Sequence, residues 1–267
     1  MKKLILFIAF LPALTFAQNA KQLLDAGRAK ISTGDFNGAI TVLSRSLGLE
    51  PKNAGAFYFR GVAKSSLKQY DEAINDFNSA ISINPKYYLA YHDRGLAKAS
   101  QNKYKDAIAD LDKSIALKPD FADGYYNRGH VKAGMGDKKG AITDLTKAIA
   151  LNPKIPEAYF YRGALYMDFK FFNSAIADFN HLLALRPQDA YGFYLKGVAE
   201  YATLKFKPSL GDLNRSLQID PQNPDAYNGR GLTKYALKDK AGACADFTKA
   251  NQLGSKNAAE NLAKFCR

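Results

Sequence analysis

A glycine recurs every 34 residues along the 267-residue chain. Three other positions repeat in the same phase: a small residue twelve places after the glycine, a leucine or phenylalanine four places further on, and a proline that closes each of the first six copies. Self-similarity at a fixed period of this length is typical of repeat architectures. The glycines of this ladder are Gly27, Gly61, Gly95, Gly129, Gly163, Gly197 and Gly231.

Each of these positions has a physical role in a pair of helices. The glycine lets the first helix (helix A) approach its neighbours closely, because a side chain there would push them apart. The small residue on the second helix (helix B) serves the same contact, and the proline ends helix B because its ring cannot continue the hydrogen-bond ladder. We predict short amphipathic helix pairs that stack to share one elongated core.

The pattern resembles the tetratricopeptide repeat family, whose signature is aromatic-x-x-L-G-x-x-Y, then A-x-x-x-F, then P. The resemblance covers about residues 20 to 257 and implies an all-α, right-handed superhelical solenoid of about seven helix-turn-helix units. Residues 258–267 are predicted to form a capping helix over the last apolar face. The predicted repeats span about residues 20–53, 54–87, 88–121, 122–155, 156–189, 190–223 and 224–257.

Residues 1–17, MKKLILFIAFLPALTFA, have the pattern of a Sec-type signal peptide. Two lysines precede an apolar run, and Thr15 and Ala17 supply small residues for cleavage after Ala17. The run is too short to span a bilayer comfortably and Pro12 interrupts it, although an uncleaved N-terminal anchor is an alternative. We therefore expect an exported protein, periplasmic or secreted, that does not span a membrane.

A basic residue precedes the glycine in repeats two to seven, and an aspartate stands sixteen places later each time. Repeat one lacks both, with Ala26 and Val42 at these places. This covariation predicts a partly buried ion pair between helix A and helix B. The pairs are Arg60 with Asp76, Arg94 with Asp110, Arg128 with Asp144, Arg162 with Asp178, Lys196 with Asp212, and Arg230 with Asp246.

The positive charge of the chain is spread over every repeat. The formal net charge is +13, and removal of Lys2 and Lys3 with the signal peptide would leave +11. Such a balance favours acidic partners or anionic surfaces. We interpret the scattered lysines as a solvated outer face, and because each arginine of the repeated pairs has its own aspartate, we expect no nucleic acid partner.

The two cysteines, Cys244 in repeat seven and Cys266 in the capping helix, are predicted to form a disulfide. An even number of cysteines in an exported protein favours this state, and two packed free thiols are the alternative. The histidines His92, His130 and His181 are scattered, and the chain has no nucleophile elbow, P-loop, zinc spacing or dinucleotide fingerprint. We predict no enzyme activity, no metal site and no cofactor.

In the family, the concave surface is lined by helix A residues two, five, six, nine, twelve and thirteen places into each unit. Carried onto this chain, the resemblance implies a tyrosine-rich groove, although any one ring can instead pack between neighbouring helices. The lysine and asparagine clamp of the chaperone-binding members is absent at these places. The groove residues would be Tyr58, Phe59, His92, Tyr126, Asn127, His130, Phe160, Tyr161, Tyr191, Tyr194, Tyr201, Asn228 and Tyr235.

The resemblance implies a non-catalytic protein–protein interaction scaffold, and the export signal places it in the cell envelope. We expect it to bind a peptide or protein in the tyrosine-rich groove, since amphipathic rings anchor such partners well. Two alternatives remain at this point: a small-molecule or glycan ligand stacked on the same tyrosines, and electrostatic association of the whole surface with an anionic polymer. High salt would abolish only the last of these.

Overall fold

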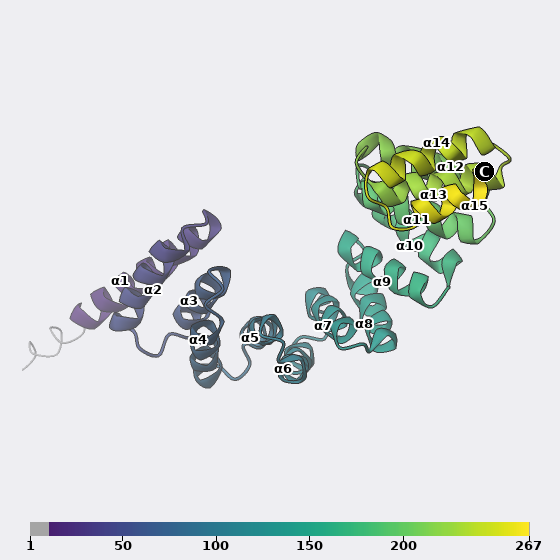
Figure 1. Cartoon of the computed structure of the whole chain (residues 1–267). Helices are drawn as coiled ribbons and strands as arrows, with labels where there is room; N and C mark the ends of the chain where they lie inside the picture. Colours follow the sequence, from purple (N-terminus) through teal and green to yellow (C-terminus); the bar gives the residue numbers. More distant parts are fainter. Residues whose placement is uncertain (1–10, 267) are drawn as a thin grey trace, which may run out of the picture. The chain divides into compact units, whose positions relative to one another are not determined.

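The computed structural model describes residues 11–266, with side-chain detail from residue 19 on. Within this range the chain folds into fifteen α-helices and no strands (Figure 1). The helices A are α1 (Leu11–Ser32), α3 (Ala54–Ser66), α5 (Tyr88–Ser100), α7 (Ala122–Gly134), α9 (Pro156–Asp168), α11 (Ala190–Ala202) and α13 (Pro224–Ala236). The helices B are α2 (Phe36–Leu49), α4 (Tyr70–Ile83), α6 (Tyr104–Leu117), α8 (Lys138–Leu151), α10 (Phe172–Leu185), α12 (Phe206–Ile219) and α14 (Lys240–Gln252), and α15 (Ala258–Phe265) follows the last pair. The expected all-α solenoid of helix pairs is confirmed.

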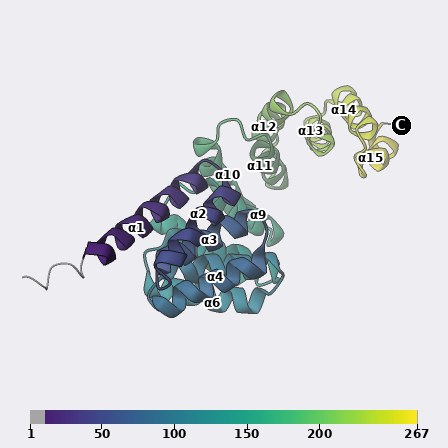
Figure 2. The same cartoon turned by 90° about the vertical axis from the view of Figure 1, so that its left-hand side faces the viewer.

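The chain forms two compact units, residues 1–137 and 138–267, which we call the N-terminal half and the C-terminal half. The division falls inside repeat four, between α7 and α8. Within each half, every helix packs on the next one along the chain. The successive helices α11 to α15 can be followed one by one in Figure 2. Within each half, each helix A also contacts the next helix A of that half. The helices A therefore form a continuous layer within each half.

The first helix is longer than the other helices A because α1 starts at Leu11 and continues to Ser32. It runs without a break past Ala17, where cleavage of the signal peptide is predicted. Residues 1–10, which hold most of the predicted signal peptide, lie outside the described residues. Across residues 11–266, no helix combines the length and the apolar character needed to cross a bilayer.

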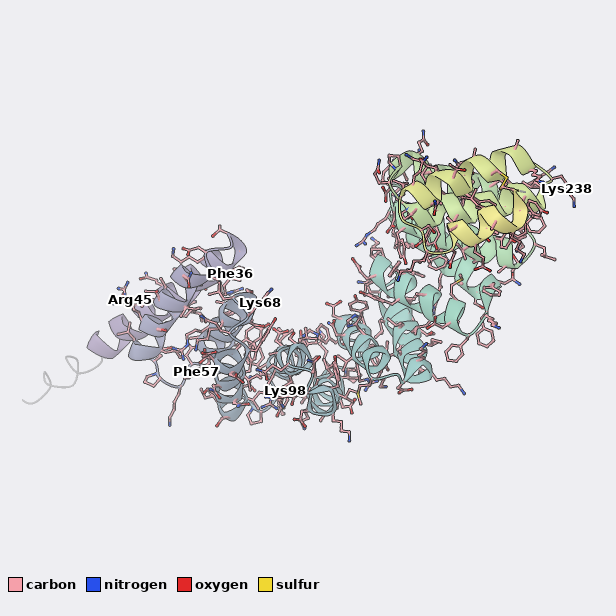
Figure 3. All side chains as sticks on the ribbon, in the orientation of Figure 1. Phe36, Arg45, Phe57, Lys68, Lys98 and Lys238 are labelled. Carbon is pink, nitrogen blue, oxygen red and sulfur yellow. A yellow bond between two sulfur atoms is a disulfide. The ribbon has the colours of Figure 1, made fainter. Side chains whose placement is uncertain are left out.

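The helix ends follow from proline and from one left-handed residue in each turn. Each helix B of the first six repeats ends two residues before its proline, as α4 does at Ile83, and the intervening Asn84 is extended with φ −128° and ψ 91°. This is the backbone that a following proline favours. Between helix A and helix B, one residue adopts a positive φ, which is 61° at Lys68 and 71° at Lys238. Figure 3 labels both residues.

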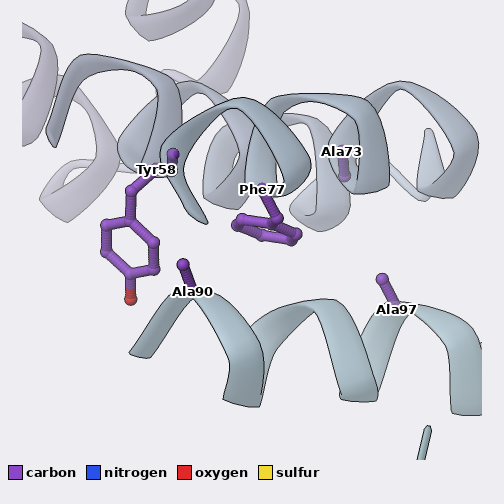
Figure 4. Packing of buried hydrophobic residues seen from close by; sticks show 6 residues of the cluster. Tyr58, Ala73, Phe77, Ala90 and Ala97 are labelled. Carbon is purple, nitrogen blue, oxygen red and sulfur yellow. The ribbon is translucent and has the colours of Figure 1, made fainter. Parts of the chain in front are cut away.

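The core of each repeat forms around the contact that the glycine ladder predicts. Phe77 is fully buried and points from α4 toward Ala90 and Ala97 of α5, beside Ala73 and Tyr58 (Figure 4). A Cβ atom on Gly61 would lie 2.7 Å from Cε1 of Phe77. Only a residue without a side chain permits this approach, which explains why glycine recurs at the position.

The last helix, α15, covers the end of the array. Its Phe265 ring lies 4.4 Å from the ring of Tyr235 and 6.0 Å from the ring of Phe247, measured between centroids. A disulfide joins Cys244 of α14 to Cys266, with the two Cα atoms 5.7 Å apart. The crosslink holds the capping helix against the helix pair that it covers.

Removal of this disulfide is expected to destabilise the C-terminal end of the array. The two cysteines are 22 residues apart in the sequence, and a loop of this size contributes about 3 kcal/mol by constraining the unfolded chain. We expect Cys244→Ser/Cys266→Ser to lower the free energy of unfolding by that amount in urea titrations. Hydrogen exchange should increase first in α15, whereas protection in α3 and α5 should stay unchanged. Equal stability of the oxidised and the double-serine proteins would contradict this expectation.

Candidate functional site

The repeated arginine–aspartate pairs are formed inside both halves of the molecule. In repeat three, Arg94 donates from Nε to Oδ2 of Asp110 at 2.9 Å and from Nη2 to Oδ1 at 2.5 Å. The two-pronged geometry fixes helix A against helix B. The same pairing joins Arg60 to Asp76, Arg162 to Asp178 and Arg230 to Asp246, and Lys196 lies 3.0 Å from Asp212.

The guanidinium groups also connect neighbouring repeats. Arg94 donates from Nη1 to Oδ1 of Asn78 in the preceding repeat at 2.6 Å, and it stacks over the Tyr91 ring at 5.3 Å. A lysine four places later, Lys98, adds a second cation 2.8 Å from Asp110, which the sequence analysis missed. Arg128 likewise donates to Asp112 at 2.6 Å, and its pairing with Asp144 of the other half stays a prediction. The guanidinium groups of these arginines are therefore occupied by contacts between helices of the protein.

In repeat six, an acidic residue stands at the position of the second lysine. Glu200 stands where repeats two, three and seven have the pairing lysines Lys64, Lys98 and Lys234. Only 5% of Glu200 is exposed, its Oε2 atom accepts no hydrogen bond, and Lys196 Nζ lies 3.9 Å from Oε1.

The surroundings of Glu200 favour its neutral form. Burial raises the pKa of Glu200 to about 7, together with a hydrogen bond to Asp212 and the negative charge of that residue, while Lys196 and Lys205 act in the opposite direction. When Glu200 is protonated, its carboxyl group can donate a hydrogen bond to the Asp212 carboxylate.

The stability of the C-terminal half should therefore fall as the pH rises. The folded state binds a proton at Glu200 between the ordinary pKa of 4.5 and about 7, whereas the unfolded state does not. The free energy of unfolding should decrease by about 2 kcal/mol across this interval. Urea titrations near pH 5 and pH 8 would measure the decrease, and Glu200→Gln should remove it. Glu200→Lys, which introduces the lysine found in repeats two, three and seven, should stabilise the protein at neutral pH. An unchanged pH slope in Glu200→Gln would assign the effect to another group.

In the N-terminal half, a chain of hydrogen bonds connects three successive helices A. The Tyr58 hydroxyl donates to Oδ2 of Asp93 at 2.8 Å, and Oδ1 of Asp93 lies 2.7 Å from Nδ1 of His92. The Asn127 amide nitrogen lies 2.9 Å from Nε2 of His92. With Asn127 donating to Nε2, Nδ1 of His92 is the ring nitrogen that donates to Asp93. Burial and the negative charge of Asp93 raise the pKa of Tyr58.

Three predicted groove residues are thus part of the packing between repeats. Tyr58, His92 and Asn228 are only 8%, 6% and 9% exposed. Asn228 accepts a hydrogen bond from Asn261 of α15 at 2.7 Å. These three side chains turn toward the next helix of the array, so little of them is accessible to a partner.

An open depression of about 410 Å³ lies on the helices A of repeats one and two. Its lining includes Asp25 and Arg28 of α1 and the ring of Phe59 of α3. The Arg28 guanidinium stands over the Phe59 ring at 5.1 Å and lies 3.7 Å from Asp25. Phe59 was among the predicted groove residues, whereas Asp25 and Arg28 were not. They occupy the sixth and ninth places of repeat one, so the family positions applied to that repeat would have found them.

In the C-terminal half, four predicted groove residues form a contiguous group, which we call the aromatic strip: Tyr161, Phe160, Tyr191 and Tyr194. Ring centroids lie 5.4 Å apart for Tyr161 and Phe160, 6.0 Å for Phe160 and Tyr191, and 5.6 Å for Tyr191 and Tyr194. The strip crosses from α9 to α11, and Tyr191 is 51% exposed. Burial, and then the charge of Asp225, raise the pKa of Tyr194 to about 12.

The remaining predicted groove residues lie outside the strip. Tyr201 packs against Phe206 at 5.6 Å, close to the turn between α11 and α12, and the partly exposed Tyr235 packs against the capping helix. In the N-terminal half, α7 carries the half-buried Tyr126 and the exposed His130. Among the described residues, no group of three or more His, Cys, Asp or Glu side chains is placed to hold a metal ion.

Comparison with protein families finds matches to three stretches of the chain. Residues 54–87 and 122–155 each match a family model described as tetratricopeptide repeat, and residues 95–136 match one described as TPR repeat. No enzyme family is among these matches. No curated protein sequence matches the chain.

Solved structures of tetratricopeptide repeat proteins share the fold. A tetratricopeptide repeat protein from Parabacteroides merdae is 21% identical with a TM-score of 0.61, and the match covers 93% of this chain and 98% of that one. PilF of Pseudomonas aeruginosa is 15% identical with a TM-score of 0.71, covering 79% of this chain and 96% of that one. YrrB, described as a TPR protein with an unusual peptide-binding site, is 21% identical with a TM-score of 0.59, covering 73% and 97%. At these identities the likeness concerns the fold.

Proposed function

Because the chain belongs to the tetratricopeptide repeat family, we propose that it is a non-catalytic scaffold of the cell envelope that holds a peptide or protein partner on its helices A. The observation that carries the proposal is the aromatic strip. Its four rings lie on adjacent helices A, which are rigid elements of the solenoid. Aromatic rings that are partly exposed on a rigid surface contribute large contact areas at a small cost in side-chain entropy, and they often dominate binding.

The strip suits a peptide better than a small hydrophilic ligand. The rings of Tyr161, Phe160, Tyr191 and Tyr194 follow one another in a row, and no two neighbouring centroids are more than 6.0 Å apart. An extended or helical segment can place successive side chains on successive rings. Asp225, near Tyr194, supplies a negative charge at this end of the strip. A partner with apolar side chains followed by a basic one would match this order.

Two observations support the envelope as the location. Residues 1–17 have the composition of a cleavable signal peptide, and export would expose the mature chain to an oxidising compartment. The disulfide between Cys244 and Cys266 is consistent with such a compartment, because cytosolic conditions keep most thiols reduced.

Crosslinking in cells followed by affinity capture would test the proposal. We expect the wild-type protein to capture a specific envelope protein, and Tyr161→Ala/Tyr191→Ala/Tyr194→Ala to lose it at least about tenfold. Tyr104→Ala is the matched control, because its hydroxyl bonds to Asn102 in the turn that precedes α6, outside the C-terminal half. Circular dichroism would confirm that all variants fold.

Each outcome of the capture separates the alternatives. If the triple variant still captures the partner, the protein would still be interpreted as a scaffold, but the aromatic strip would be excluded as its binding site. Absence of any protein partner, together with saturable quenching of tyrosine fluorescence by a glycan or small molecule, would favour a ligand-binding protein instead.

A further inference from the structure

The turns between helix A and helix B in repeats five and six expose large apolar side chains. Phe171 is 57% exposed and Leu204 is 74% exposed. The residue before helix B, which is Phe171 in repeat five, is polar in the other repeats: Asp35, Gln69, Lys103, Asp137, Lys205 and Asp239. The left-handed turn residue, which is Leu204 in repeat six, is glycine or polar elsewhere: Gly34, Lys68, Asn102, Gly136, Lys170 and Lys238.

Neither residue is required by the fold. Leu204 adopts a φ of 61°, a conformation that glycine and asparagine adopt more easily than leucine. Phe171 makes no side-chain cap on α10, whereas Asp35 and Asp239 cap α2 and α14 in the corresponding turns. An exposed leucine in a left-handed turn reduces the stability of the protein alone, and the exposed Phe171 adds no cap to α10, which indicates a use of both residues outside the core.

The two turns lie on one edge of the C-terminal half. Lys205 of the second turn donates from Nζ to Oδ1 of Asn173 at the start of α10, at 3.2 Å. Phe171 also belongs to a cluster of rings, with centroids 6.0 Å from Phe169 and 6.3 Å from Tyr166. Phe171 and Leu204 are therefore exposed in neighbouring turns on the same edge, and we call the apolar side chains of these two turns the patch.

The charge around this patch is positive. Lys170, Lys205 and Lys207 are all exposed and alternate with the apolar residues of the two turns. Asp168 carries the single exposed carboxylate within residues 166–173 and 200–208. This carboxylate is paired with Lys138 at 2.7 Å. Apolar side chains at the tips of turns can enter the headgroup region of a bilayer without a matching pocket, while adjacent lysines contact anionic headgroups.

We propose that this turn edge, formed by Phe169, Phe171 and Leu204 with Lys170, Lys205 and Lys207, docks the protein peripherally on an anionic phospholipid surface. The proposal is independent of the aromatic strip and of the partner that the strip binds. A protein partner for the same edge would need a pocket for the protruding side chains, whereas the lipid surface needs only negative charge and fluid acyl chains.

An introduced tryptophan would report on the edge directly, because the chain contains no tryptophan. In the full chain, Phe171→Trp should show a blue shift of indole emission with vesicles of phosphatidylcholine and phosphatidylglycerol, and quenching by brominated lipids. Gln69→Trp, at the same turn position of repeat two, should show neither change. This site-specific readout separates the edge from any contribution of residues 1–17.

A second variant tests whether the patch drives binding. Phe171→Gln/Leu204→Asn places in repeats five and six the residues that repeats two and three use, so the fold should be retained. It should bind the anionic vesicles at least about tenfold more weakly, and Lys170→Gln/Lys205→Gln/Lys207→Gln should reduce the preference over pure phosphatidylcholine vesicles.

An unchanged emission of Phe171→Trp with anionic vesicles would overturn the proposal, whatever the total binding. Equal vesicle binding by Phe171→Gln/Leu204→Asn and the wild type would also overturn it. A blue shift caused by a purified envelope protein, with no response to vesicles, would assign the edge to a protein partner instead.

Discussion

Substitution of Arg162 by leucine is expected to lower the free energy of unfolding of the C-terminal half by about 4 kcal/mol. Arg162 donates from Nε and Nη2 to the carboxylate of Asp178, which is 3% exposed. In repeat five, Tyr166 stands where repeats two, three and seven have a second cation, a lysine. Arg162 is therefore the one cation among the described contacts of Asp178. Removal of Arg162 leaves a buried carboxylate without a counterion. Urea unfolding at neutral pH would measure the effect.

Repeat three provides the matched control for this prediction. Arg94→Leu removes the corresponding arginine, but Lys98 remains 2.8 Å from Asp110. We therefore expect a clearly smaller loss of stability than in repeat five. Arg162→Leu/Asp178→Leu removes both charges and should recover much of the stability lost in the single variant. Equal losses for Arg162→Leu and Arg94→Leu would show that the second lysine does not compensate.

Substitution of Gly61 by valine is expected to cost about 4 kcal/mol in the N-terminal half. The first added atom would lie 2.7 Å from Phe77 Cε1 and 3.2 Å from the Ala73 carbonyl oxygen. The backbone oxygen cannot move aside without displacing α4, so the two helices must separate. Thermal and urea unfolding followed by circular dichroism would measure the loss.

Gly48 is the control for the steric explanation, because it also lies within a helix but its Cβ position meets no atom within 4 Å. Gly48→Val should change the stability by less than about 0.5 kcal/mol. If Gly48→Val were as destabilising as Gly61→Val, helix propensity and not the close approach would explain the glycine ladder.

The fold was predictable because its determinants are local and repeat in phase. Gly61 and Phe77 meet inside one helix pair, and Pro85 ends the second helix of that pair. The covariation of Arg94 with Asp110 also predicts a contact correctly, because both residues belong to the same repeat. Seven copies of the glycine spacing, and six copies each of the proline and of the ion pair, reinforce these inferences.

The surface was less predictable because it depends on how neighbouring repeats contact each other. His92 lies at a groove position of the family, yet its bonds to Asp93 and Asn127 draw it into the packing between repeats. The pairing role of Lys98 was missed because repeat five has a tyrosine and repeat six a glutamate at that place. Exposure of Phe171 and Leu204 follows from their turn positions, which only the aligned repeats reveal as unusual.

If the helices A of the C-terminal half hold a protein partner, the partner should contact the aromatic strip and not the helices B. A photoreactive phenylalanine analogue at the position of Tyr191, in the aromatic strip, should crosslink to the partner in cells. The same analogue at the position of Ala184, exposed on the helix B α10, should not. A discrete adduct from Tyr191 alone is the predicted result. Adducts of equal yield at both positions, or at Ala184 alone, would contradict the proposal that the helices A hold the partner.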